Sequence, residues 1–299
     1  RAKLYYLRDR KGKSARISAK IKKSIGVDIA EQIDEIEAVK NPQLALEVNA
    51  IGTYRLLEAA RKQKVRRFLF FSTFHVYGPK AQNPITEETI ARPVHPYSLT
   101  HHTGEDLTNW FNQSFGLQTI IVRVSNGYGY PADGQVNRWS LVFNDFCRQA
   151  VEQGQITIRS SGKQHRDFIA ITDVVNAVNH LLNLGSEIWN AGLFNLGGDC
   201  SLSIAEVAGI VTDEYRQRTG RQIPIYYGSD PPGINTEPVV FDSSKLKNTT
   251  LTKYLPTCST QWNQEDLPHV QHVFSEAYRR GGYCMRLNPP QSSAVSIQS

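Results

Sequence analysis

Residues 67–73 read Arg-Phe-Leu-Phe-Phe-Ser-Thr, in which four consecutive apolar residues lead up to two hydroxyl side chains. An apolar run of this length predicts a β-strand buried on both faces, as in a parallel sheet. Polar groups at the carboxyl end of such a strand usually face a ligand crevice. We therefore expect a crevice at Ser72 and Thr73.

A helix is expected after the polar loop that follows this strand. The sequence Pro-Tyr-Ser-Leu-Thr-His at residues 96–101 opens it, and the helix should extend to about Phe115. Tyr97 and His101 are four residues apart, which places both side chains on one face of a helix. A hydroxyl at a strand end, a phenol and an imidazole together make an acid/base set.

These two segments resemble the extended short-chain dehydrogenase/reductases, in particular the NAD-dependent nucleotide-sugar epimerases and dehydratases. Residues 72–78, Ser-Thr-Phe-His-Val-Tyr-Gly, are similar to the family's Ser-Ser/Thr-x-x-Val-Tyr-Gly motif. Tyr97 matches the family's Tyr-x-x-x-Lys motif, in which His101 replaces the lysine. The resemblance implies that Tyr97 is a general acid/base and that Thr73 bridges the phenol and a substrate hydroxyl. It also implies that Ser72, Tyr97 and His101 contact NAD.

The replacement of lysine by histidine is the chemical difficulty in this resemblance. Lowering a phenol pKa from near 10 to about 7 requires roughly 4 kcal/mol, and a mostly neutral histidine supplies little of it. His102 points about 100° away around the helix and is no substitute for His101. His75 could approach the crevice, although a packed or solvent-facing side chain is the interpretation we favour.

The resemblance extends from about Asn41 to about Leu255 and implies an α/β fold. We expect an incomplete Rossmann-like doubly wound parallel sheet with a small carboxyl-terminal α/β lobe. The glycine-rich Gly-x-x-Gly-x-x-Gly turn, which holds the pyrophosphate of the dinucleotide, is not found in this sequence, whose first glycines are Gly12 and Gly26. NAD remains the cofactor that the resemblance implies, but we expect this chain to bind it weakly.

Two further segments suggest substrate contacts. Residues 123–131, Arg-Val-Ser-Asn-Gly-Tyr-Gly-Tyr-Pro, are similar to the family's Arg-x-x-Asn-x-Tyr-Gly-Pro loop, which implies that Asn126 contacts the nucleotide sugar. The alternative is a turn that satisfies its own backbone. Arg166, in a segment similar to the family's Arg-Asp-Phe/Tyr-Val, could bind a nucleotide diphosphate or pair with an acid. No arginine lies in residues 229–235, where the family has a second phosphate contact, so the sugar class stays open.

Composition places few limits on function. With 299 residues, of which 40% are hydrophobic and 10% aromatic, the chain should form one large or two small domains. The four cysteines are scattered, which predicts buried thiols of a reducing compartment, with no disulfide and no metal site. No apolar run approaches the roughly 20 residues of a membrane helix. We therefore expect a cytoplasmic protein with no membrane partner.

The two ends differ from the body of the chain. Residues 1–25 hold ten Lys/Arg and one Asp, a net charge of +9 that suits RNA phosphates, and residues 1–20 resemble the carboxyl-terminal end of bacterial ribosomal large-subunit protein L-nineteen. A solvated basic tail is the alternative. We expect a junction helix over 26–40, an epimerase/dehydratase-like domain over 41–285 and a disordered tail over 286–299. Within that domain, the small lobe should comprise mainly residues 132–165 and 195–285.

Three functions remain open from the sequence. The leading one is an NAD-dependent epimerase/dehydratase acting on a nucleotide sugar, degenerate or incomplete as given, and conceivably a homodimer. The second is a non-catalytic protein that binds a sugar nucleotide or another partner. The third is an RNA-associated fusion acting through residues 1–25.

Overall fold

The computed structural model describes residues 35–249, apart from 80, 130–140, 191 and 231–235. The described residues form two units. The first contains those up to Asn126, Asp173–Asp199 and those from Val239 onward, and the second contains Gly127–Thr172 and Cys200–Pro238. The predicted basic segment 1–25, most of the junction helix and the predicted tail 286–299 lie outside the described residues.

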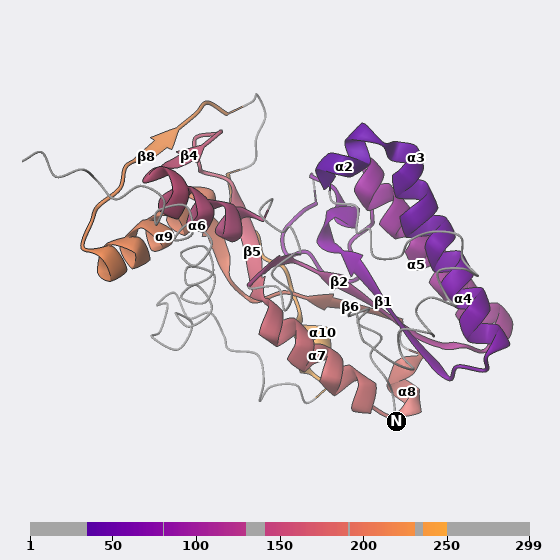
Figure 1. The fold of residues 1–299 in the computed structure, drawn as a ribbon. Helices are drawn as coiled ribbons and strands as arrows, with labels where there is room; N and C mark the ends of the chain where they lie inside the picture. The colour runs from indigo at the N-terminus through magenta and orange to yellow at the C-terminus, as the bar shows by residue number, and fades with distance from the viewer. Residues whose placement is uncertain (1–34, 80, 130–140, 191, 231–235, 250–299) are drawn as a thin grey trace, which may run out of the picture. The chain divides into compact units, whose positions relative to one another are not determined.

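The first unit contains a parallel sheet of three strands (Figure 1). The strands are β1 (Arg67–Thr73), β2 (Gln118–Val124) and β6 (Gly192–Leu196), in the order β1-β2-β6. Thr73 is the register partner of Val124, and Val124 that of Leu196. Because the strands are parallel and in this register, their carboxyl ends meet at one edge of the sheet.

Helices cover both faces of this sheet (Figure 1). On one face, α5 packs directly on β1 and β2, and the preceding helical segments pack on α5 or α4. On the other face lie α7 and α8. The predicted doubly wound α/β architecture is therefore confirmed. The helices are α2 (Glu35–Lys40), α3 (Pro42–Ala45), a π-helical segment (Leu46–Ile51), α4 (Gly52–Lys62), α5 (Pro96–Phe115), α7 (Ile171–Asn183), α8 (Ser186–Trp189) and α10 (Ser244–Lys247).

The expectation that β1 is buried on both faces is wrong. Phe70 is buried, but Phe71 is 43% exposed and Phe68 and Leu69 are half-buried. The reason is the position of the strand, because among the described residues β1 pairs with β2 alone and is the edge strand. Successive side chains point to opposite faces, so Phe71 lies on the face opposite Phe70, which meets α5, and at the edge of the described sheet it has neighbours on one side only.

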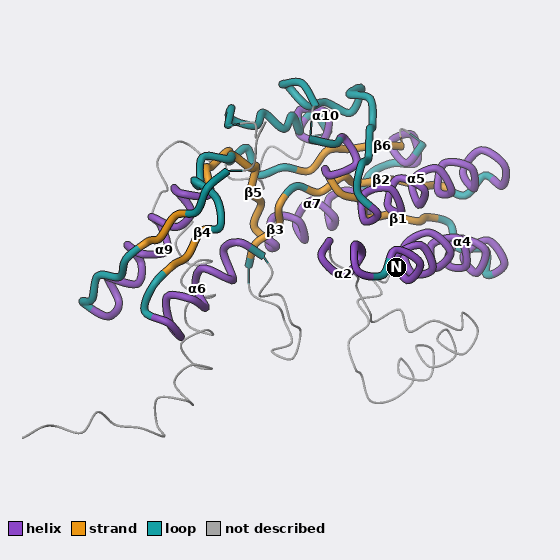
Figure 2. The backbone as a smooth tube through the Cα atoms, turned by 90° about the horizontal axis from the view of Figure 1, so that it is seen from above, coloured by secondary structure: helices purple, strands orange, loops and turns teal. Residues whose placement is uncertain are grey.

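The second unit is built around its own apolar core. Strands β3 (Asn126–Tyr128), β5 (His165–Ala170) and β7 (Ser201–Ser203) form one sheet, and β4 (Ile156–Ile158) pairs with β8 (Ile225–Tyr227). Helices α6 (Val142–Gln153) and α9 (Ile204–Thr219) pack together beside β4 (Figure 2). The core includes Phe143, Phe168 and Val207. Cys147 and Cys200 are buried free thiols, as predicted. Among the described helices, none is long and apolar enough to cross a membrane.

Candidate functional site

The end of β1 turns sharply at Thr73. The Thr73 Oγ1 atom accepts a hydrogen bond from the backbone N–H of His75 at 3.3 Å, which begins one turn of 3₁₀-helix over Phe74–Tyr77. Ser72 and Thr73 are both buried. The turn therefore places His75 two residues after Thr73, whose hydroxyl the sequence predicts to be functional.

Helix α5 begins at Pro96, as predicted, and its start is fixed by a reciprocal cap. The His95 imidazole accepts a hydrogen bond from the Tyr97 backbone N–H at 3.2 Å, and Ser98 Oγ accepts one from the His95 N–H at 3.4 Å. Such capping boxes satisfy backbone donors that have no partner within the helix. Tyr97 therefore lies in a well-anchored first turn.

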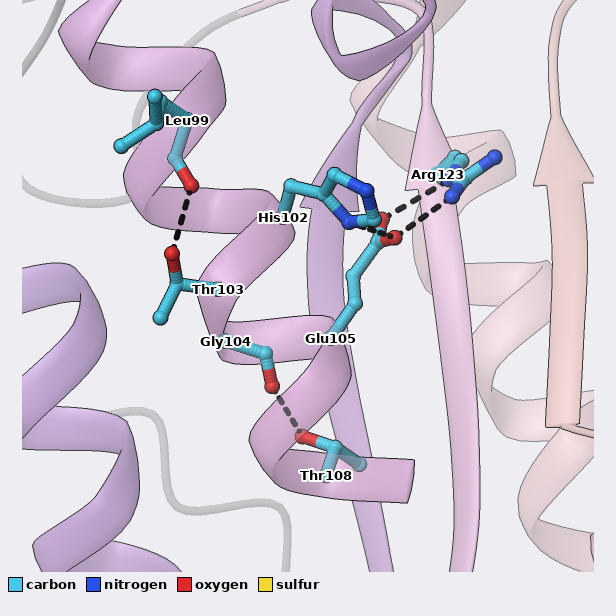
Figure 3. Close-up of polar contacts among 7 residues, drawn as sticks. All are labelled: Leu99, His102, Thr103, Gly104, Glu105, Thr108 and Arg123. Atoms are coloured by element: carbon cyan, nitrogen blue, oxygen red, sulfur yellow. Dashed lines mark hydrogen bonds and ion pairs between the residues drawn. The ribbon is translucent and has the colours of Figure 1, made fainter. Parts of the chain in front are cut away.

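Two contacts fix α5 against the sheet. A Cβ atom added at Gly104 would lie 2.5 Å from Phe70 Cζ, so only glycine allows the helix to approach β1 this closely. The next residue, Glu105, receives two hydrogen bonds from Arg123 of β2, at 2.9 Å and 2.6 Å (Figure 3). His102 Nδ1 lies 3.3 Å from the same carboxylate. The position of α5 thus depends on a close backbone approach and a buried ion pair.

The Glu105 carboxylate is charged although it is only 3% exposed. Burial alone would raise the pKa of Glu105, but the hydrogen bonds from Arg123 and His102 outweigh it and lower the pKa to about 2. The same carboxylate raises the pKa of His102, against the effect of burial. This pair has no signal in the sequence, because its members are 18 positions apart and meet only where α5 packs on β2.

A buried polar row continues from Arg123 across the sheet. The Arg123 guanidinium lies 4.5 Å above the Tyr77 ring, and the Tyr77 hydroxyl donates to Asn195 Oδ1 at 2.6 Å. The Asn195 amide donates to the carbonyl oxygens of Ile85 and Asp242, both at 3.2 Å. Asn195 is therefore structural and links β6 to Tyr77, Ile85 and Asp242 within the first unit.

Tyr97 lies between two imidazoles. Its ring is 4.5 Å from that of His101, measured between centroids, at an interplanar angle of 61°. This contact confirms the predicted shared face of α5. The Tyr97 ring is also 6.2 Å from that of His75, in a T-shaped arrangement at 81°. The half-buried His75 ring packs on Phe74, as favoured, but it also approaches the phenol.

His101 is poorly suited to carry charge. Burial is the largest cause that lowers its pKa, Glu105 opposes the shift in part, the nearby His75 adds to it, and the net result is a pKa of about 4. The His101 Nδ1 atom is buried and has no hydrogen-bond partner in the described part of the chain. Near neutral pH the imidazole is therefore uncharged, and it cannot supply the fixed positive charge of a lysine.

The predicted substrate residues lie in different units. Asn126 is half-buried and follows β2 by two residues, so it lies at the sheet edge where Thr73 ends β1. Arg166 belongs to the second unit, where it is half-buried in β5 as the register partner of Leu202. Within the described ranges, no group of three or more His, Cys, Asp or Glu residues is placed to hold a metal ion.

The described residues fit one end of a dinucleotide. An orphaned, buried ring nitrogen such as His101 Nδ1 is a group that a ribose hydroxyl can satisfy, and it lies beside the Tyr97 ring. The Ser72 Oγ atom, at the end of β1, is likewise buried without a hydrogen-bond partner among the described residues.

A parallel sheet between two layers of helices, with a hydroxyl and a phenol at its carboxyl edge, defines a protein of the dinucleotide-binding class. The chain belongs to the NAD dependent epimerase/dehydratase family, whose sequence profile matches residues 10–197. The family resemblance predicted from the motifs is thus confirmed. The match begins at residue 10, whereas we expected the resemblance to start at about Asn41.

The relatives of the chain are nucleotide-sugar enzymes by name. The uncharacterized UDP-glucose epimerase YtcB of Bacillus subtilis is 32% identical over 241 residues, covering 78% of this chain and 71% of the relative. The UDP-glucose 4-epimerase of Halalkalibacterium halodurans is 30% identical over 203 residues, covering 63% of this chain and 58% of the relative. These comparisons give no support to the ribosomal resemblance of residues 1–20.

The fold is also shared with solved structures. The UDP-glucuronic acid 4-epimerase from Bacillus cereus, in complex with UDP-glucuronic acid and NAD, superposes with a TM-score of 0.63 at 25% identity. The superposition covers 78% of this chain and 68% of that one. The UDP-glucose 4-epimerase from Thermus thermophilus, in complex with NAD, has a TM-score of 0.65 at 25% identity and covers 81% of this chain and 75% of that one.

Proposed function

We propose that the chain interconverts nucleotide sugars by acid/base chemistry at a sugar hydroxyl, with Tyr97 as the group that exchanges the proton. The observation that carries this proposal is the placement of the Tyr97 phenol in the first turn of α5, between His75 and His101. Thr73 would orient the hydroxyl, and Asn126 and Arg166 would contact the nucleotide sugar. Family membership and relatives named as UDP-glucose epimerases support this substrate class.

NAD is the cofactor of the proposed reaction. Tyr97, His101 and Ser72 would hold the nicotinamide ribose, and His101 Nδ1 is the atom with unused bonding capacity. When bound, NAD supplies a hydride acceptor and donor for the sugar carbon. The protein holds the sugar, orients the hydroxyl and moves its proton.

The test is incubation of the chain with millimolar NAD and a panel of UDP- and dTDP-sugars, followed by proton NMR of the sugar products. We expect a 4-epimer or a 4-keto product from at least one sugar nucleotide. If the whole panel is recovered unchanged at saturating NAD, the proposal is wrong.

A second function is favoured by one observation, the low pKa of His101, about 4, which leaves Tyr97 without a fixed neighbouring cation. On that basis the chain would bind a sugar nucleotide without converting it. Saturation-transfer NMR separates the two functions, because a binding protein shows transfer to the nucleotide sugar but yields no product. The RNA-associated alternative rests on the net charge of residues 1–25 alone. Salt-dependent RNA binding that disappears when these residues are deleted would support it.

A further inference from the structure

A phenol that accepts a proton from a sugar hydroxyl must give up its own proton, and the structure offers two imidazoles to receive it. Both His75 and His101 approach the Tyr97 ring. The choice between the two imidazoles as acceptor of the Tyr97 proton rests on the proposed function, because both lie at the site proposed for the sugar. The geometry of the two side chains separates them.

His101 is enclosed. Its ring lies against those of Tyr97 and Phe70, at centroid distances of 4.5 Å and 6.2 Å, and its Nδ1 is buried without a partner. A protonated imidazole has two N–H donors to satisfy, and one of them would be stranded here. The carboxylate that could compensate, Glu105, is already bound by Arg123 and His102. With a pKa lowered to about 4, chiefly by burial, His101 is too weak a base for neutral pH.

His75 is held differently. It lies two residues after Thr73, and its backbone N–H donates a hydrogen bond to the Thr73 hydroxyl. Its ring packs on Phe74 at 4.0 Å and stands edge-on to Tyr97 at 6.2 Å, a separation that a direct contact or one water spans. The side chain is half-buried, so it is exposed enough to exchange a proton with solvent.

We propose that His75 is the base that takes the phenolic proton of Tyr97. The O–H bond of Tyr97 breaks as an N–H bond forms on the His75 ring, and the phenolic oxygen takes the proton of the sugar hydroxyl. His75 then passes its proton to water. It acts through Tyr97 and not on the sugar, while His101 stays neutral.

The titratable groups that face His75 come from helix α5. Helix α5 packs on the turn that carries His75 and contributes two titratable groups, Tyr97 and His101. A positive charge on His75 lowers the pKa of His101, in the same direction as burial does.

The test measures the reactivity of the phenol without turnover. The purified full chain is treated with N-acetylimidazole, and acetylation of Tyr97 is followed by peptide mass spectrometry, with the 52%-exposed Tyr226 as internal standard. We expect His75→Gln to slow Tyr97 acetylation by about tenfold or more at neutral pH. His101→Gln should change the rate by less than about twofold.

His75→Glu and His75→Gln have side chains of nearly the same shape, so comparing them separates the effect of a proton acceptor from the effect of packing. His75→Glu keeps a proton acceptor where His75→Gln has none, so it should retain the wild-type rate within about threefold. If Glu and Gln slow the reaction equally, or if His101→Gln slows it as much as His75→Gln, the inference is overturned. No sugar or NAD takes part in this measurement. An intact acetylation pattern without sugar turnover would therefore refute the proposed function and leave the inference standing.

Discussion

Glu105 shows how much a single residue can contribute in this fold. Its carboxylate is buried, receives both hydrogen bonds of the Arg123 fork and holds α5 to β2 (Figure 3). Removing one partner of a buried ion pair leaves the other charge uncompensated. The pair therefore matters most when it is broken.

We predict that Glu105→Gln lowers the free energy of unfolding by about 3–5 kcal/mol, because the buried Arg123 guanidinium loses its counter-charge. Urea denaturation followed by circular dichroism measures this. Glu58→Gln is the matched control, since Glu58 forms a solvent-exposed pair with Arg61 on α4 and its loss should have far less effect. A comparable loss of stability in both variants would contradict this account of the pair.

The same residue predicts a pH dependence of stability. The folded-state pKa of Glu105, about 2, lies below its ordinary value of 4.5, so its contribution is complete above pH 4.5 and is lost as the pH falls toward 2. A difference of this size corresponds to about 3 kcal/mol. Urea titrations between about pH 6 and 2.5 should show a smaller acid loss in Glu105→Gln than in the wild type. Parallel curves would show that another group dominates the acid limb.

At the scale of single residues, the sequence predicted what local spacing determines. Tyr97 and His101 share a helix face because they are four apart, and the structure confirms this with rings in contact. Contacts that depend on how α5 packs against the sheet and the turn after β1 could not be predicted from local sequence. Neither the Glu105–Arg123 pair nor the approach of His75 to Tyr97 has a signal in the nearby sequence. The roles of Thr73, Asn126 and Arg166 remain predictions.

At the scale of elements, α5 was predicted with its observed bounds. Pro96 can begin a helix, and Gly116 ends it in the left-handed region at φ 67°. Strand β1 was predicted in place but with the wrong burial. Its apolar run resembles a central strand, yet Phe71 is exposed because pairing partners, which local sequence does not encode, decide what covers a strand.

We predict that Gly104→Ala destabilises the first unit by about 1–3 kcal/mol, because the new Cβ would lie 2.5 Å from the Phe70 ring and push α5 from β1. Gly209→Ala is the matched control in helix α9, where a Cβ meets no atom within 4 Å. That change should be neutral or stabilise by up to about 1 kcal/mol through helix propensity. Hydrogen exchange resolves the two units. Equal protection of α5 in wild type and Gly104→Ala would contradict the packing argument.

At the scale of the whole molecule, the affinity of the chain for NAD is the property to be measured. The chain belongs to an NAD dependent family, but its sequence contains no Gly-x-x-Gly-x-x-Gly turn to hold a pyrophosphate. We predict that residues 1–299 bind NAD weakly, with a Kd above about 100 μM by isothermal titration calorimetry. NAD that copurifies in stoichiometric amount would show that other residues replace the missing turn.

The central claim is that Tyr97 is the proton-exchanging group of a nucleotide-sugar enzyme. The most direct measurement compares turnover of the converted sugar nucleotide by the wild type, Tyr97→Phe and Tyr54→Phe at saturating NAD. Tyr54 is the control because its ring packs on Phe111 of α5, away from the imidazoles that flank Tyr97. We predict that Tyr97→Phe lowers kcat by about a hundredfold or more and that Tyr54→Phe stays within about threefold of the wild type. Turnover by Tyr97→Phe at the wild-type rate would contradict the claim.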